Sequence, residues 1–204
     1  MDKLKSVFKV NKKIMVFLFC FFIISVIFGS LLPLFLSESD KILVTNYLSD
    51  FVGNIENYNG VSLFLNGLYS NLGLCIFIFI LGISVVGVFF VLILFFLKGF
   101  ILGFSLTSII VNYGFKGILF GFVYLFPHQI INMFLLSVLT CYSVSFSFKF
   151  ILFLLKKYDF NIRLSFKRFF IVFCLCSSLI VLCVLYESFL LPNVLTFIFK
   201  LLGL

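Results

Sequence analysis

The sequence predicts an all-α integral membrane protein, a bundle of about five spanning helices. Hydrophobic residues make up 64% of the chain and charged residues 11%, and the mean hydropathy is +1.33. Soluble domains contain roughly 45–50% apolar and about 25% charged residues. A soluble fold of this composition could not cover its core with polar surface. We therefore expect one multi-pass membrane domain over residues 1–204.

The first predicted span is residues 14–36, which follow a basic tail at residues 1–13. Crossing a hydrocarbon core of ~30 Å takes about 20 residues, so this uncharged run is long enough. It is longer than the apolar region of a typical signal peptide, and Ser30-Leu31-Leu32-Pro33 is a poor cleavage site. We expect the segment to be retained as a membrane span.

Residues 37–70 form the one sizeable polar stretch, with four acidic residues and one lysine. Apolar residues recur there at helical spacing, namely Ile42, Leu43, Tyr47, Leu48, Phe51 and Val52. Residues 54–60, Asn-Ile-Glu-Asn-Tyr-Asn-Gly, then read as a turn. The pattern predicts a short amphipathic helix outside the membrane, followed by a second helix that enters near Asn66.

The other spans are predicted where apolar runs meet charges, glycines or proline. We expect span 2 at residues 71–97, a broken span 3 region at 99–126, span 4 at 128–155 and span 5 at 169–191. Asn112-Tyr113-Gly114 should break the third region. Residues 117–126, stopped by Pro127, should form a short re-entrant or interfacial helix.

The distribution of basic residues predicts the orientation. Lysines crowd the first 13 residues, and five basic residues lie in the segment 156–168. Both segments should be cytoplasmic by the positive-inside rule, and the acidic segment 37–70 should be outside. Five crossings would then place residues 192–204 outside the cell.

Small and ionisable residues within the apolar runs are the candidates for structural or partner contacts. Gly99-x-x-x-Gly103 and Gly117-x-x-x-Gly121 are patterns that let membrane helices approach closely. His128 is the sole histidine, and Glu187 is the one acid in the last long apolar run. Both should lie near the outer side, so we predict a His128–Glu187 contact. The full candidate set is Gly82, Gly87, Gly99, Gly103, Gly117, Gly121, Pro127, His128, Gln129, Glu187 and Pro192.

Catalytic and metal-binding motifs do not occur in the sequence. There is no GxSxG, HExxH or P-loop motif, and the six cysteines lie in apolar runs without ligand spacing. These observations predict a protein that is not an enzyme and holds no cofactor or metal. The formal net charge of +8 lies at the ends of apolar runs, which argues against a nucleic-acid partner.

The order of the small and polar residues in the centre of the chain resembles that of the stage II sporulation protein M family. The resemblance lies in LGISVVG, then LFFLKGFILGFSLTSIIVNYGFKGILFGFVYLFPHQIINMF, then SVSFSFK at residues 81–149. The endings VIFGSLLP of the first span and YESFLLP of the fifth, with Glu187 and Pro192, are also similar to that family.

The resemblance implies a non-enzymatic scaffold in the cell membrane, in the mother-cell septal or engulfing membrane. There it would assemble and localise peptidoglycan-degrading partners, stage II sporulation proteins D and P, during forespore engulfment. Membrane lipid and a second copy of the chain are further expected partners. A small permease or channel-like transporter is the alternative, because broken helices and intramembrane histidine are features of transporters.

Overall fold

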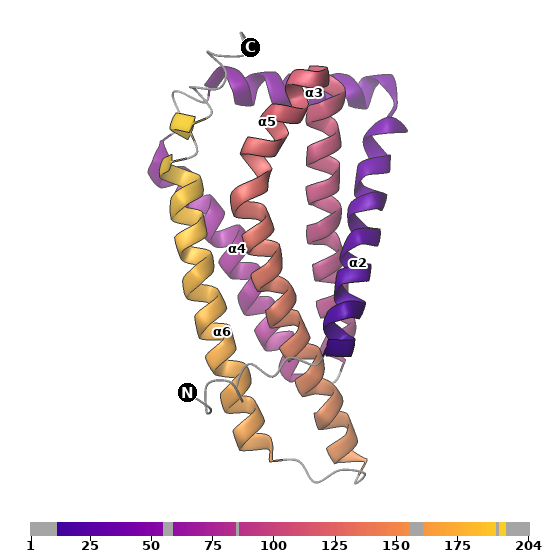
Figure 1. The fold of residues 1–204 in the computed structure, drawn as a ribbon, viewed down its shortest axis with the longest axis vertical. Helices are drawn as coiled ribbons and strands as arrows, with labels where there is room; N and C mark the ends of the chain where they lie inside the picture. The colour runs from indigo at the N-terminus through magenta and orange to yellow at the C-terminus, as the bar shows by residue number, and fades with distance from the viewer. Residues whose placement is uncertain (1–11, 55–58, 85, 156–160, 191, 195–204) are drawn as a thin grey trace.

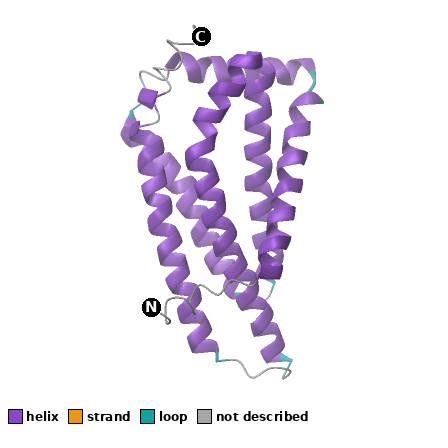
Figure 2. Cartoon of the chain, in the orientation of Figure 1, coloured by secondary structure: helices purple, strands orange, loops and turns teal. Residues whose placement is uncertain are grey.

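The computed structural model describes residues 12–54, 59–84, 86–155, 161–190 and 192–194, and all described elements are helical (Figures 1 and 2). The predicted all-α class is confirmed. Five helical stretches in the described residues are long and apolar enough to cross a membrane: Lys12–Leu34, Gly60–Ile83, Gly87–Leu119, His128–Leu154 and Ile162–Val194. The predicted number of spans is therefore confirmed as well.

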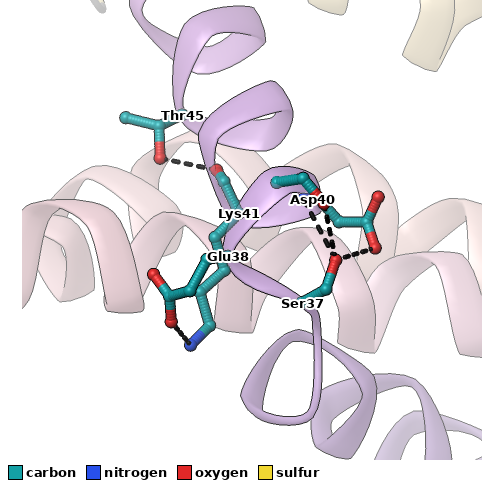
Figure 3. A network of polar contacts seen from close by, with 6 residues as sticks. Ser37, Glu38, Asp40, Lys41 and Thr45 are labelled. Carbon is teal, nitrogen blue, oxygen red and sulfur yellow. Dashed lines mark hydrogen bonds and ion pairs between the residues drawn. The ribbon is translucent and has the colours of Figure 1, made fainter.

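The first span is helix α2, Lys12–Leu31, extended by a 3-10 turn, η1, at Leu32–Leu34. Helix α3, Glu38–Asn54, then lies across one end of the bundle, at the top of Figure 1. Ser37 precedes α3, and its hydroxyl accepts a hydrogen bond from the Asp40 amide at 3.4 Å, as a helix-capping serine does (Figure 3). A helix is thus present where the sequence predicted one after residue 37.

Helix α4, Gly60–Ile83, returns along the bundle, and its first turn is capped by the Asn59 side chain, which accepts from the Val61 amide at 3.1 Å. The expected limits of this span, residues 71–97, are wrong at both ends. The helix begins at Gly60 and stops before Ser84, whose amide donates to the Leu81 carbonyl at 3.0 Å. The outer segment is therefore shorter than the predicted 37–70, because α4 already begins at Gly60.

Helix α5, Gly87–Leu154, consists of two arms joined at Gly114, whose backbone has φ 56° and ψ −134°. This left-handed backbone conformation is one that glycine adopts without steric cost, so Gly114 reverses the chain at the end where α3 lies. The predicted break at residues 112–114 is present. We call residues 87–113 the first arm and residues 115–154 the second arm.

The short separate helix expected at residues 117–126 is part of the second arm of α5. The helix runs through position 127 into the fourth span. Proline removes one backbone donor, but membrane helices tolerate it where neighbouring groups satisfy the freed carbonyl. The expected stop at Pro127 was therefore wrong.

Helix α6, Ile162–Leu185, continues into a single π-helical turn, η3, at Tyr186–Leu190. Its start is seven residues earlier than the predicted 169, because the Asn161 side chain caps the helix by accepting from the Leu164 amide at 3.2 Å. Arg163, Lys167 and Arg168, expected in a loop, are therefore helical. The rest of the expected loop at 156–160 lies outside the described residues, as do residues 1–11 of the tail and 195–204.

Phenylalanine rings join α4, α6 and the second arm of α5. The ring of Phe79 stacks on Phe173 with centroids 4.4 Å apart and lies 4.9 Å from Phe169. Phe146 of the second arm stacks on Phe169 at 5.7 Å. Aromatic pairs of this kind contribute about 0.5–1.5 kcal/mol each beyond their buried area. These ring contacts hold α4, α6 and the second arm of α5 against one another. Helix α2 packs on the first arm of α5 instead.

Candidate polar centre of the bundle

His128 and Glu187 meet inside the bundle, as the sequence predicted. The Nε2 atom of His128 lies 3.5 Å from the Oε1 atom of Glu187, with side chains 1% and 25% exposed. His128 comes from the second arm of α5 and Glu187 from the π-turn η3. A π-turn adds a residue to the helix and rotates the side chains that follow, and such turns are frequent at functional sites.

A second polar pair lies in the same bundle, between α4 and the first arm of α5. Lys98 donates from Nζ to the Asn71 side-chain oxygen at 2.9 Å, and the Asn71 amide donates to the Gly67 carbonyl at 3.1 Å. Glu187 lies within electrostatic range of Lys98. A membrane lysine is costly unless it is paired, so Asn71 and Glu187 explain how Lys98 is accommodated.

Asn132 adds an amide one helical turn after His128. Its side chain is 3% exposed, and neither amide atom has a hydrogen-bond partner among the described residues. A buried amide without a partner costs roughly 1–3 kcal/mol. Residues at this spacing share one face of a helix, so His128 and Asn132 together make that face of the second arm polar.

Lys98 and Asn71 were missed as site residues by the sequence analysis. Lys98 was interpreted as the cytoplasmic end of span 2, since a lysine after a long apolar run usually marks a membrane boundary. The apolar residues on both sides of Lys98, at helical spacing, were the available signal that it lies inside a span. Asn71 was placed at a helix start and carried no comparable signal.

The space beside most of the predicted glycines is filled by other atoms of the same chain. A Cβ atom at Gly103 would lie 3.0 Å from the Val26 carbonyl carbon, and one at Gly99 would lie 3.1 Å from the Phe22 ring. These two glycines therefore let α2 approach the first arm of α5. The predicted tight packing of the small-xxx-small pattern at 99–103 is present, and its partner is helix α2.

The remaining predicted glycines also face neighbouring parts of this chain. A Cβ at Gly82 would lie 2.9 Å from Ser143 Cβ, one at Gly87 would overlap the Leu81 backbone, and one at Gly117 would lie 3.1 Å from Ile110 Cα. Gly121 has more room, with Leu106 at 3.2 Å. Ser147 reinforces the contact at Gly82, because its hydroxyl donates to the Gly82 carbonyl at 2.6 Å.

The other sequence candidates lie near the polar centre but outside it. Gln129 and Pro192 are half-buried, and the side chain of Pro127 lies outside the described part of the chain. Within the described residues, no group of three or more His, Cys, Asp or Glu side chains could hold a metal ion. The centre brings together one histidine, one glutamate, one lysine and two amide side chains as hydrogen-bonding groups.

The fold and the polar centre together define a class: a multi-pass helical membrane protein with a buried His–Glu pair and a paired intramembrane lysine. A family model narrows this class. The model of stage II sporulation protein M, SpoIIM, matches residues 16–192, and the chain belongs to that family. A search of curated proteins and a search of solved structures each gave no match. The protein is therefore a sporulation-related membrane protein.

Proposed function

We propose that the protein is a non-enzymatic scaffold that gathers peptidoglycan-degrading enzymes at the membrane during forespore engulfment. The observation that carries the proposal is the family match over residues 16–192. The proposed partners are stage II sporulation proteins D and P. In the polar centre, His128 contacts Glu187 and Lys98 donates to Asn71 inside the bundle, which supports a structural role for these four residues.

Helix α3 is the surface that we propose for partner contact. Leu43 and Tyr47 are 66% and 74% exposed and lie one turn apart on this helix. Thr45 donates to the Asn112 side-chain oxygen at 2.6 Å, which ties α3 to the end of the first arm of α5. A helix held across the end of the bundle offers a fixed surface outside the spans (Figure 1).

The charge pattern supports an outward orientation for α3. By the positive-inside rule, Lys12, Lys13 and the basic first turns of α6 favour the cytoplasm. The starts of α2 and α6 lie at the opposite end of the bundle from α3 (Figure 1). We place α3 on the side of the mother-cell membrane that faces the peptidoglycan, where wall-degrading partners act. The Lys41–Glu38 ion pair at 3.1 Å is exposed and contributes little to stability (Figure 3).

The test is affinity capture of the tagged full chain from sporulating cells in mild detergent. The wild-type chain should recover two wall-degrading proteins. The double variant Leu43→Ser/Tyr47→Ser should lose at least one of them while its thermal stability stays unchanged. The matched control is Leu154→Ser/Leu155→Ser, which alters two exposed leucines at the other end of the bundle and should retain both.

Two results would contradict the proposal. One is the absence of wall-degrading proteins from the wild-type capture under conditions that retain a known membrane complex of the same cells. The other is that substrate flux appears in proteoliposomes of the purified chain alone, which would favour the transporter alternative.

A further inference from the structure

An apolar groove opens between α2 and the second arm of α5, with Phe95 of the first arm at its floor. It encloses a cavity of about 430 Å³. Nine of its ten lining residues are hydrophobic, and they are contributed by both helices: Met15, Val16, Leu18, Phe19, Phe22, Phe95, Ile130, Met133, Phe134 and Ser137. All of them belong to stretches apolar enough to span a membrane. The groove therefore opens toward lipid and not toward water.

The walls fit a flexible chain better than a helix. The hydroxyl of Ser137 is bonded to the Phe134 carbonyl of its own helix at 2.7 Å, so it offers its proton to no ligand. Helix association in membranes favours small residues that let two backbones approach closely. Here phenylalanine and methionine side chains form the walls, and methionine adapts readily to irregular shapes. These features favour an acyl chain over a partner's membrane helix.

Two basic side chains stand at one end of the groove. Lys12 and Lys13 are exposed in the first turn of α2, and Lys12 precedes Val16 by one helical turn on the same face. Helical side chains lean toward the N-terminus, which directs Lys12 away from the groove and toward the membrane surface. The first turn of α2 contains no acidic residue that would neutralise the lysines.

We propose that this groove and its two lysines bind one anionic phospholipid, with an acyl chain in the groove and the head-group phosphate at Lys12 and Lys13. A basic residue near an anionic lipid surface contributes about 1 kcal/mol. That energy corresponds to roughly a fivefold preference for anionic over zwitterionic lipid for each engaged lysine. The site does not depend on the proposed scaffold role, because its residues lie outside α3.

Because the sequence contains no tryptophan, a single introduced tryptophan can serve as a fluorescent reporter of one position. Phe134→Trp places one indole in the groove wall, on a side chain that is 60% exposed. The full-length variant is reconstituted in phosphatidylcholine vesicles that carry a minor fraction of lipid brominated on its acyl chains. Bromine quenches tryptophan on contact, so quenching reports acyl chains in the groove. Leu182→Trp on α6, 61% exposed and outside the groove, is the matched control.

With both lysines engaged, we expect brominated phosphatidylglycerol to quench the Phe134→Trp reporter at a fraction roughly 25-fold lower than brominated phosphatidylcholine requires. The Leu182→Trp control should respond equally to the two lipids. Lys12→Gln/Lys13→Gln should abolish the preference at Phe134→Trp, and because both lysines are exposed the chain should fold normally. Ser137→Phe, which fills the groove, should lower quenching by either lipid.

Equal quenching of Phe134→Trp by the two lipids would overturn the proposal, as would a preference that survives Lys12→Gln/Lys13→Gln. A preference shared by the Leu182→Trp control would also overturn it, because the enrichment would then reflect the net charge of the whole protein. If Ser137→Phe prevents folding, the lysine variant decides the outcome alone.

Discussion

Gly103→Ala should separate α2 from the first arm of α5. The added Cβ would lie 3.0 Å from the Val26 carbonyl carbon and 3.1 Å from the Ser30 amide nitrogen. Non-bonded carbon atoms pack at about 3.5–4.0 Å, and the Val26 and Ser30 atoms both belong to the backbone, so no rotamer change relieves the overlap. Overpacking of this kind costs roughly 1–3 kcal/mol. The opposing gain in helix propensity from glycine to alanine is at most about 1 kcal/mol.

Gly73→Ala is the matched control, because a Cβ at Gly73 in α4 would meet nothing within 4 Å. It should gain roughly 0.5–1 kcal/mol from helix propensity alone. The gain in helix propensity is common to the two variants, so they should differ by the overpacking cost alone, about 1–3 kcal/mol in the free energy of unfolding. For a chain of this size that difference corresponds to roughly 2–12 °C in melting temperature, with Gly103→Ala the lower.

The melting temperatures can be measured in detergent with a dye that becomes fluorescent on reaction with thiols. Cys75, Cys141 and Cys176 are buried, so their thiols react with the dye when the bundle opens. The exposed Cys20 and Cys174 would react before unfolding, and both are replaced by serine in the background chain. A Gly103→Ala protein that melts at or above the temperature of Gly73→Ala would refute the argument that α2 packs on Gly103.

Three further predictions concern the polar contacts. In a double-mutant cycle of His128→Gln and Glu187→Gln, thermal melts should give a coupling energy of about 1 kcal/mol, and additive effects would exclude the contact. Asn71→Leu should destabilise the bundle by roughly 1–3 kcal/mol because it removes the hydrogen-bond acceptor of Lys98, and Lys98→Met in that background should restore stability; no recovery would show that Glu187 alone satisfies Lys98. Thr45→Val should leave the melting temperature unchanged but speed hydrogen exchange in α3, and unchanged exchange would show that α3 is held by other contacts.

The sequence predicted features for which the physical signal is local. Residues 14–36 are uncharged over a membrane's width, and Asn112-Tyr113-Gly114 contains the glycine whose positive φ reverses the chain. The His128–Glu187 contact was predictable because each residue is the single one of its kind in a long apolar stretch. Burial of an ionisable group in lipid requires a partner, and few partners were available.

The limits of α4 and α5 were not predictable by the same reasoning. Residues 74–97 contain no charge, so composition could not indicate that one helix ends at Ile83 and the next begins at Gly87. Lys98 is the first charge after this run, but it does not mark the end of a membrane span. Its ammonium group donates a hydrogen bond to Asn71 inside the bundle. A charge marks a membrane edge only when water is its partner, and a tertiary contact cannot be inferred from composition.

The glycine contacts change where partner binding should be sought. Glycine stripes on a membrane helix suggest a surface for another chain, yet Gly82, Gly99 and Gly103 are filled by neighbouring helices of this chain. A partner's membrane helix would have to displace α2 or the second arm of α5 to use them. The partner contact that we propose is therefore more favourable on α3, where exposed side chains such as Leu43 are available without opening the bundle. It follows that glycine substitutions should lower stability and partner capture together, whereas Leu43 substitutions should lower capture alone.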